Sequence, residues 1–483
     1  MRTIVDTSFL FLAIACPLSM IINMIKMLKF PLADLVFDME KKVPSASALA
    51  METEGEKVTV ETHEQKAEPL PPQRGVVFTV FTGRHFMEAA TNDLRPEMLK
   101  KTAQDLVKKA EDLIRYDGPV IDPGEMTDQE FYVQRQIKNE DVPLAQKIDL
   151  CRSCKNRLEQ ADKRVTSALC QYLFVRTREL FVNRHKKLYQ DLKRTQAVAF
   201  VVMCNGERAA ELHTGHAYQG GYEHAAIAED KLDKLIADCA SILFAERLNP
   251  GYYDCIFSPA FAGMFAHEAF GHGMETDMFL KHRAKGAEYI NKHVASPLVN
   301  MFDSPALPGQ AASFFFDHEG QPASETQIIE NGILKSGLTD LNSALRLNIR
   351  RTANGRRESF SNKIYARMTN TYFGPGKNSL EEMLKDISFG YLLEHPSNGM
   401  EDPKGWGIQL EGYYAAEIRD GQLTGKVYSP VIVTGSVPEL LGSITMVGDK
   451  IEISGLGMCG KGHKEWVKVT DGGPYVRLKA RLG

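Results

Sequence analysis

The stretch FAHEAFGHGMETD, residues 265–277, decides how the second half of the chain must fold. It places His267 and His272 five positions apart, with Glu268 directly after the first histidine. Many zinc peptidases carry H-E-x-x-H, in which histidines four apart share one face of a helix. On a regular α-helix, residues five apart differ in direction by about 140°, so both rings could not bind one ion. A single π-type turn places such residues nearly above one another. We therefore predict a π-bulge or an early helix end over residues 268–273.

The residues around the motif favour this distorted helix. Ser258 and Pro259 provide a cap and a first-turn residue, so a helix is expected to begin there. Gly271 and Gly273 flank His272, and glycine makes a local backbone distortion cheap. The extra residue between the histidines is therefore compatible with a metal site.

A catalytic zinc site needs a third protein ligand and an open position for water. The candidates close in sequence carry a carboxylate or an imidazole: Glu275, Asp277, His282 and His293. A distant candidate is Cys459 in the glycine-rich stretch SGLGMCGKG, because a thiolate is a strong zinc ligand. An alternative is a closed structural site that adds Cys255 as a fourth ligand.

The two halves of the chain have different patterns. Residues 44–246 mix amphipathic helical stretches with alternating, strand-like runs. Residues 247–483 contain hairpin turns such as Asn331-Gly332 and Asp420-Gly421 between short apolar runs. The sequence predicts an α+β fold: an N-terminal α+β domain, followed by a mostly antiparallel β C-terminal domain, barrel-like or sandwich-like, with one metal-binding helix.

Residues 1–43 form an apolar N-terminal extension. Within it, residues 8–25 are long and apolar enough to suggest three alternatives: an export signal, a membrane anchor, or a segment that packs on the first domain or lies outside the fold. Localisation depends on this choice. The expected compartment is cytoplasmic, and the alternative is a protein exported or anchored through residues 8–25.

Composition narrows the possible functions. The hydrophobic content of 43% and charged content of 25% are typical of a soluble globular protein. The net charge of −4 and the absence of a basic arm argue against a nucleic-acid partner. Eight scattered cysteines do not resemble a disulfide framework. The pair Cys151 and Cys154 has no second pair after it and is interpreted as a feature of a helix surface.

An ordered set of motifs then points to a family. HEAFGHGMETD, IIENGILKSG, NGRRES, RMTNTYFGPGK, ITMVGDK and GMCGKG follow one another along the chain. In this order they resemble the TldD branch, the catalytic branch, of the TldD/PmbA metalloprotease family. The resemblance is close over about residues 250–465.

The resemblance implies a barrel-like C-terminal domain that carries the metal, and with it a site, a cofactor and partners. His267, His272 and Cys459 would bind Zn²⁺, and Glu268 would be the catalytic acid and base. The family forms dimers, so a homodimer or a heterodimer with a PmbA-like subunit is expected. Its catalytic members cut unfolded peptides such as leader sequences. The alternative is a non-catalytic partner or a chaperone-like subunit with a structural metal site.

Three further residues fall within the resembling motifs. Arg356, Arg357 and Asn370 are candidates for binding the backbone or terminus of a substrate. They could equally form salt bridges and contacts at strand ends.

Overall fold

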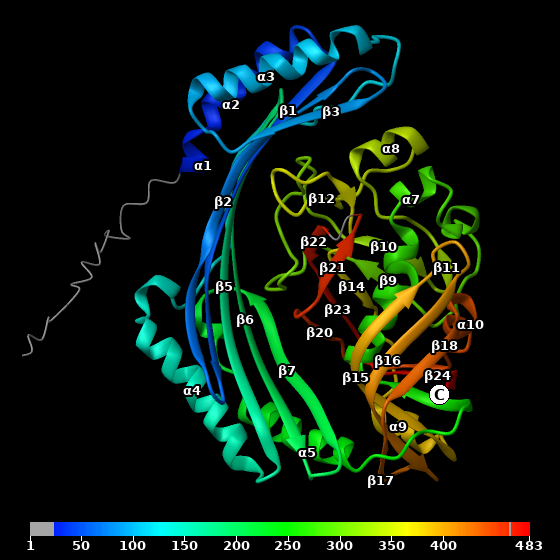
Figure 1. Ribbon diagram of the computed structural model, residues 1–483. Coiled ribbons are helices and arrows are strands. Elements are labelled where there is room, and N and C mark those ends of the chain that lie inside the picture. The colour runs from blue at the N-terminus through cyan, green and yellow to red at the C-terminus, as the bar shows by residue number, and fades with distance from the viewer. Residues whose placement is uncertain (1–23, 463–464) are drawn as a thin grey trace, which may run out of the picture.

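The computed structural model describes residues 24–462 and 465–483, and two halves of the chain face each other in it (Figure 1). Long strands of the N-terminal half form an arched sheet. The C-terminal half lies against the concave side of this arch. Helices and strands occur in both halves, so the α+β class predicted from the sequence is confirmed.

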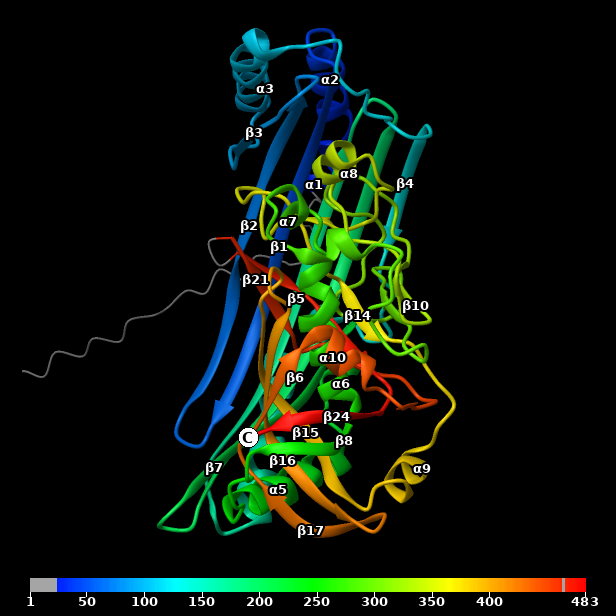
Figure 2. The same cartoon turned by 90° about the vertical axis from the view of Figure 1, so that its right-hand side faces the viewer.

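The arched sheet has seven strands in the order β3-β2-β1-β5-β6-β4, with β7 also paired to β6. All neighbours are antiparallel except β4 and β6. The strands are β1 (Ser45–Glu61), β2 (Gln65–Phe81), β3 (Phe86–Thr91), β4 (Thr127–Tyr132), β5 (Val165–Val182), β6 (Lys186–Cys204) and β7 (Ala209–Gln219). Several are longer than ten residues, which lets the sheet reach along the whole C-terminal half (Figure 2).

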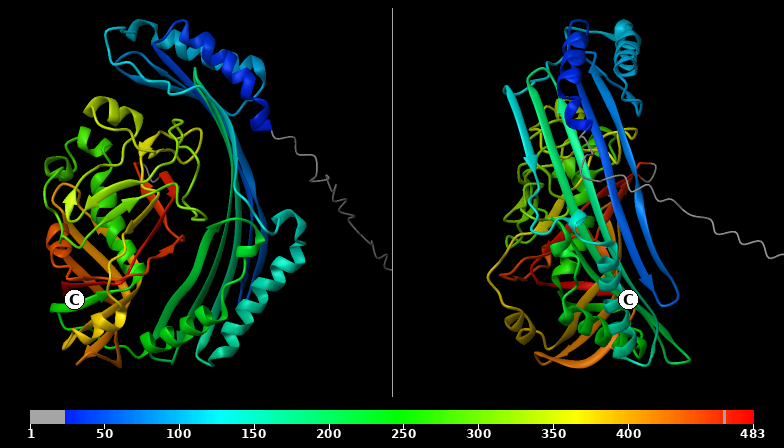
Figure 3. Two further views of the ribbon diagram at one scale, coloured as in Figure 1. Left: turned by 180° about the vertical axis from the view of Figure 1, so that it is seen from behind. Right: turned by 90° about the vertical axis from the view of Figure 1, so that its left-hand side faces the viewer.

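Among the residues that the structure describes, five α-helices accompany this sheet: α1 (Met24–Met27), α2 (Lys29–Glu40), α3 (Pro96–Ala110), α4 (Leu144–Ala161) and α5 (Glu229–Leu243). Figure 3 shows α4 on the convex side, away from the C-terminal half. Helix α3 begins with a proline and buries Leu99, Ala103 and Leu106 at helical spacing. Apolar residues at this spacing predict such a helix in the sequence.

The N-terminal extension is only partly described, because residues 1–23 lie outside the described part of the chain. Most of the apolar segment at 8–25 therefore lies outside it. Helix α2 buries Leu32, Val36 and Met39 in a cluster with side chains of β1 and α3. Its residues thus pack on the arched sheet. Among the residues described, we find no helix with the length and apolarity needed to cross a bilayer.

The two free cysteines of α4, Cys151 and Cys154, differ in their environments. Cys154 is partly exposed, whereas Cys151 is fully buried in an apolar cluster that includes Cys170 of β5. The prediction of a helix is confirmed, but that of a surface feature is wrong for Cys151. Its side chain faces the sheet, where α4 packs on β5.

The C-terminal half contains a closed barrel of five strands. The order is β15-β8-β24-β18-β16, and β16 pairs again with β15 to close the ring. The strands are β8 (Gly251–Phe257), β15 (Phe389–Glu401), β16 (Gly407–Arg419), β18 (Val431–Ser436) and β24 (Val476–Leu482). Only β8 and β15 are parallel. The predicted antiparallel, barrel-like domain is confirmed.

Short strands complete this half. β17 (Gln422–Tyr428) and β19 (Met446–Val447) extend the barrel sheet. A second sheet has the order β11-β10-β9-β14-β23-β20, with β9 (Met301–Asp303), β10 (Thr326–Glu330), β11 (Ile333–Leu334), β14 (Asn370–Phe373), β20 (Glu452–Ser454) and β23 (Thr470–Gly473). Two hairpins pair β12 (Gly355–Arg356) with β13 (Tyr365–Ala366), and β21 (Met458–Lys461) with β22 (Glu465–Lys468). Short helices are α7 (Asp277–Leu280), α8 (Leu341–Leu347), α9 (Leu380–Lys385) and α10 (Val437–Gly442).

Helix α6 (Pro259–Ala266) lies between the barrel and the second sheet, in contact with β15, β14 and β23. Seven of its eight residues are buried, as expected for a helix that is apolar on every side. The Oγ of Ser258 accepts a hydrogen bond from the amide of Phe261, so the predicted cap is confirmed. The helix therefore holds its carboxyl end rigidly inside this half.

Candidate metal centre

The helix that carries the histidines is distorted where the sequence requires it. Helix α6 is followed by a π-turn, η5 (His267–Gly271), and a 3₁₀ turn, η6 (His272–Met274). Phe270 leaves helical geometry, with φ −116° and ψ 15°. The predicted π-bulge is confirmed and begins one residue earlier than expected.

This distortion brings the two imidazoles together. The ring centroids of His267 and His272 are 5.0 Å apart, and the ring planes are nearly perpendicular at 85°. Gly271 is closely packed, since a Cβ at that position would lie 2.1 Å from the Sδ of Met368. A larger residue would therefore have to displace Met368 from beside the π-turn.

Cys459 joins the histidines from the β21–β22 hairpin. Its Sγ lies 3.4 Å from the Nε2 of His272. The ligand atoms of His267, His272 and Cys459 all lie within 4.8 Å of one another, and Cys459 and His267 are buried. The geometry thus gathers three residues from segments almost two hundred positions apart.

The charges of these groups support one another. Burial raises the pKa of the Cys459 thiol, but the neighbouring His272 and His267 more than offset this and lower the pKa to about 5. Burial opposes the imidazolium form of His272, yet Cys459 and Glu275 raise its pKa well above the usual value. The thiol is therefore held ready as a thiolate, the form that binds metals.

These donors fit a zinc ion. Two imidazoles and one thiolate are typical zinc ligands, and three protein ligands leave a fourth position open. The Nδ1 of His267 is buried without a hydrogen-bond partner among the described residues. The donor set and this unpaired ring nitrogen suit a bound ion better than a set of ordinary core side chains.

Glu275 orients His272 through its carboxylate. The Nδ1 of His272 lies 3.2 Å from Oε2 of Glu275, which also accepts a hydrogen bond from Nζ of Lys461 at 2.9 Å. Nε of Arg367 lies 3.6 Å from the other carboxylate oxygen. Burial raises the pKa of Glu275, but Lys461, His272 and Arg367 reverse this and lower it. Such partners of a ligating histidine fix its ring orientation.

Arg367 and Lys461 also fix the hairpin that carries Cys459. Arg367 is fully buried and donates to the carbonyl of Cys459 at 2.6 Å. Lys461 donates to Asp277 at 2.6 Å as well as to Glu275. The carboxylates of the histidine segment are thereby connected to the cysteine segment by two cations.

Replacing Glu275 with glutamine should lower the zinc affinity about 10–100-fold, as the loss of an outer partner of a ligating histidine typically does. The amide keeps the shape but loses the charge that holds His272, Lys461 and Arg367. Competition with a chromogenic chelator measures the affinity, and Glu439→Gln at an exposed position of α10 is the matched control. Equal affinities in wild type and Glu275→Gln would contradict this role.

Glu268 is left free beside the ligands. It forms no hydrogen bond or ion pair with another described residue, and its side chain packs against the backbone of β15. A Cβ at Gly399 would lie 2.9 Å from Cδ of Glu268. Its position directly after His267, together with its free carboxylate, suits a proton-transferring group.

Two more carboxyl groups lie near this site, and no motif in the sequence indicates that they belong to it. Both oxygens of Glu401, at the end of β15, are buried without a partner among the described residues. Burial, reinforced by Glu268 and Asp402, raises the pKa of Glu401 to about 9. Burial also raises the pKa of Asp471, which lies near His267 and Glu268, to about 6.

The other ligand candidates from the sequence lie elsewhere. Glu275 and Asp277 are paired with Lys461. His282 and His293 do not belong to the group of ligand atoms found among the described residues. Cys255 is buried in β8, where its Sγ lies 3.5 Å from the carbonyl of Tyr253. The closed four-ligand site with Cys255 is therefore not assembled.

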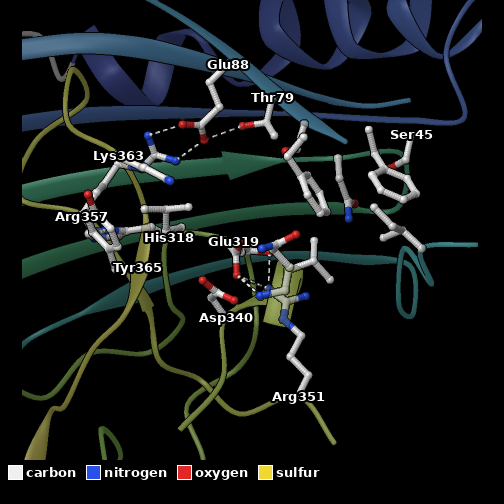
Figure 4. A pocket seen from close by; sticks show the side chains of 18 of the residues that line it. Ser45, Thr79, Glu88, His318, Glu319, Asp340, Arg351, Arg357, Lys363 and Tyr365 are labelled. Carbon is white, nitrogen blue, oxygen red and sulfur yellow. Dashed lines mark hydrogen bonds and ion pairs between the residues drawn. The ribbon is translucent and has the colours of Figure 1, made fainter. Parts of the chain in front are cut away.

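The three predicted substrate-binding residues have different surroundings. Asn370 is buried and bonds to Ser304, Ser313 and Thr470, so its amide holds the second sheet together. Figure 4 shows the Arg357 guanidinium directed at Glu88 of β3, with Nη2 2.5 Å from Oε1. This ion pair joins the two halves. For these two residues the alternative of salt bridges and strand-end contacts fits the structure.

Arg356 has a different setting. It is buried and donates to two backbone carbonyls, those of Met368 and Lys468. It also lines a cavity beside the β21–β22 hairpin. Among the described residues it forms no ion pair with a carboxylate.

Comparisons with known proteins agree with this arrangement. Residues 250–481 match the PmbA/TldA metallopeptidase C-terminal domain. A metalloprotease of Methanothermobacter thermautotrophicus is 30% identical over 343 residues, which cover 70% of this chain and 74% of that protein. A zinc metalloprotease TldD homolog of Saccharolobus solfataricus is 34% identical over 235 residues, which cover 47% of this chain and 51% of the relative. The match therefore spans about half of the latter protein.

The fold also resembles a solved structure. The crystal structure of TldE from Thermococcus kodakarensis superposes with a TM-score of 0.75 at 18% sequence identity. The superposition covers 94% of this chain and 99% of that one. At this identity the likeness concerns the fold alone.

Proposed function

Because this chain belongs to the TldD/PmbA metallopeptidase family, we propose that it is a zinc-dependent peptidase that hydrolyses unfolded peptides or leader peptides. The observation that carries the proposal is the assembly of His267, His272 and Cys459 beside a free Glu268. A peptidase needs the metal ligands and a proton-transferring group in one place.

The metal would be held by the two imidazoles and the thiolate. A zinc ion bound there supplies a Lewis acid that polarises the substrate carbonyl and acidifies a water molecule. Glu275 holds the ring of His272 in place through Nδ1. Arg367 holds the backbone of Cys459. These contacts keep the ligands in position without needing the substrate.

Glu268 performs the proton transfers in this proposal. It accepts a proton from the attacking water while the oxygen forms a bond to the peptide carbon. It then gives that proton to the amine nitrogen as the carbon–nitrogen bond breaks. One water is consumed, and one carboxyl group and one amine are formed.

The proposal includes a dimer, either with a second copy or with a PmbA-like chain. Light scattering of the purified chain, alone and with such a partner, measures the assembly. If cleavage is seen only when the partner is present, the partner has an accessory role in cleavage. Tight peptide binding without any cleavage would instead support the chaperone-like alternative.

Removing the metal should abolish cleavage of an unfolded peptide, and about one zinc per chain should restore it. Elemental analysis of the purified protein measures the zinc, and a peptide labelled with a fluorophore and a quencher reports cleavage. Addition of Mg²⁺ is the control, because a thiolate site favours zinc over a hard cation. Full cleavage by the metal-free protein would refute the proposal.

A further inference from the structure

A cavity of about 480 Å³ lies between the concave face of the arched sheet and the β21–β22 hairpin. The sheet contributes Met51, Leu173 and Val175, and the hairpin contributes Met458 and Trp466. These side chains give the cavity apolar walls. Four Arg and Lys side chains also line it: Arg194, Arg356, Arg357 and Lys468. Arg357 forms an ion pair with Glu88, which leaves Arg194, Arg356 and Lys468 as three further cations.

Among the described residues these three cations form no ion pair with a carboxylate. The side chain of Arg194 forms no hydrogen bond or ion pair with another described residue, and its Nε is buried. Lys468 donates to the amide oxygen of Gln196 at 3.0 Å. Arg356 donates only to backbone carbonyls. Arg356 is buried, and Arg194 and Lys468 are partly buried. Charges withdrawn from water are normally paired, so a cavity lined by three cations without ion pairs is expected to hold an anion.

Three carboxylates lie near enough for their charges to act on these cations: Glu179 on Arg194, Asp303 on Arg356 and Asp471 on Lys468. Among the described residues none of the three forms an ion pair with its cation. Glu179 bonds to His318 and Gln190. Glu358 is exposed and accepts a hydrogen bond from the amide of Trp466. Asp303 bonds to Asn354, Thr369 and Thr371.

This arrangement disfavours the charged forms of the cations, and their pKa values are lowered. Burial, together with the charge of Arg194, lowers the pKa of Lys468 to about 7. The same two effects lower that of Arg356 to about 9. An anion bound among the three side chains would relieve both the desolvation and the repulsion.

The cavity adjoins the metal centre through one hairpin. Lys468 pairs with Met458 in the β21–β22 register, and the next pair is Cys459 with Val467. A group held by Lys468 therefore lies next to the strand position that supplies the thiolate. A peptide with its reacting bond at the metal would have a neighbouring part of its chain within reach of the cations.

We propose that Arg194, Arg356 and Lys468 bind a carboxylate of the peptide substrate while its apolar side chains lie on the cavity walls. The inference rests on the proposed peptidase function and specifies its substrate class. The carboxylate is either the free carboxyl terminus of a short peptide or an Asp or Glu side chain close to the cleaved bond.

Binding tests the inference independently of cleavage. The Glu268→Gln chain is titrated with fluorescein-labelled unfolded peptides, and anisotropy gives the Kd. One peptide ends in a free carboxylate and its twin in a carboxamide. A third has the carboxamide and one Glu in place of Gln. We expect one carboxylate peptide to bind roughly tenfold or more tightly than the neutral twin, because charge-assisted hydrogen bonds discriminate strongly.

The two carboxylate peptides distinguish the terminus from the side chain. Equal Kd values for all three peptides would overturn the inference. Cleavage of all three at equal rates by the wild type, with equal binding, would overturn it while leaving the peptidase proposal standing. Selective binding of a carboxylate peptide without any cleavage would support the inference and contradict the peptidase proposal.

Variants then assign the preference to the cavity. Lys468→Met and Arg194→Met should each bring the ratio of two Kd values, that of the neutral carboxamide peptide and that of the preferred carboxylate peptide, close to one. Lys426→Met on the exposed strand β17 is the matched control and should keep the wild-type ratio. Circular dichroism confirms that each variant folds. An unchanged ratio in both cavity variants would place the carboxylate elsewhere and overturn the assignment.

Discussion

Replacing Glu268 with glutamine is expected to lower peptide cleavage by about 10²–10⁴-fold, the usual contribution of a general acid–base group. The zinc content should stay the same, because Glu268 is not among the three residues whose ligand atoms lie together. Glutamine keeps the size of the side chain against Gly399 but accepts no proton at neutral pH. Elemental analysis and initial rates on one unfolded peptide measure the two quantities.

The control for this prediction is Glu381→Gln on the exposed face of α9, which should leave both quantities unchanged. Two results would contradict the role of Glu268. Wild-type cleavage by Glu268→Gln would indicate a structural metal site. Loss of zinc from Glu268→Gln would make the carboxylate a ligand instead of a proton carrier.

The distortion at the histidines could be predicted from the sequence because it follows from local geometry. Histidines five apart cannot meet on a regular helix, and η5 supplies the extra residue. The same holds for the turns at Asn331-Gly332 and Asp420-Gly421, whose residues all have positive φ. Spacing and residue type are sufficient to predict the local structure wherever it is determined by residues that are neighbours along the chain.

For the barrel, only the fold class could be predicted from the sequence, and the strand pairing that closes the ring could not. Hairpin turns indicate antiparallel neighbours, but β8 and β24 pair across more than two hundred residues. Such a pairing depends on the packing of both halves around α6, and no local pattern specifies it. The family resemblance provided the barrel-like expectation, and the register came from the structure.

The residues that support the site were missed for the same reason. The sequence makes Glu275 a candidate zinc ligand, whereas in the structure it holds His272 and contacts Lys461 and Arg367. Lys461 follows Cys459 by two residues, and Arg367 comes from a third segment. A carboxylate with two cationic partners from distant segments cannot be recognised from spacing in one sequence.

Replacing Cys459 with alanine is expected to have the largest effect on the metal. The chain should lose zinc affinity by more than the roughly 10–100-fold that follows loss of an outer partner, because a direct ligand is removed. Cleavage should disappear with the metal. His267 and His272 would remain, but two imidazoles alone do not hold zinc in the way that three ligands do.

Cobalt substitution makes the test of Cys459 specific to the thiolate. Co²⁺ in the wild-type protein should show the charge-transfer absorption of a cobalt–thiolate bond, and Cys459→Ser should lack it. Cys204→Ser, at the partly exposed end of β6, should keep it. If Cys459→Ala retained full zinc, the third ligand would have to come from another segment. Glu275 could then bind the metal only by leaving Lys461, which is partly buried, and Arg367, which is fully buried. Both cations would lose their carboxylate, so this outcome would also require the hairpin that carries Cys459 to move.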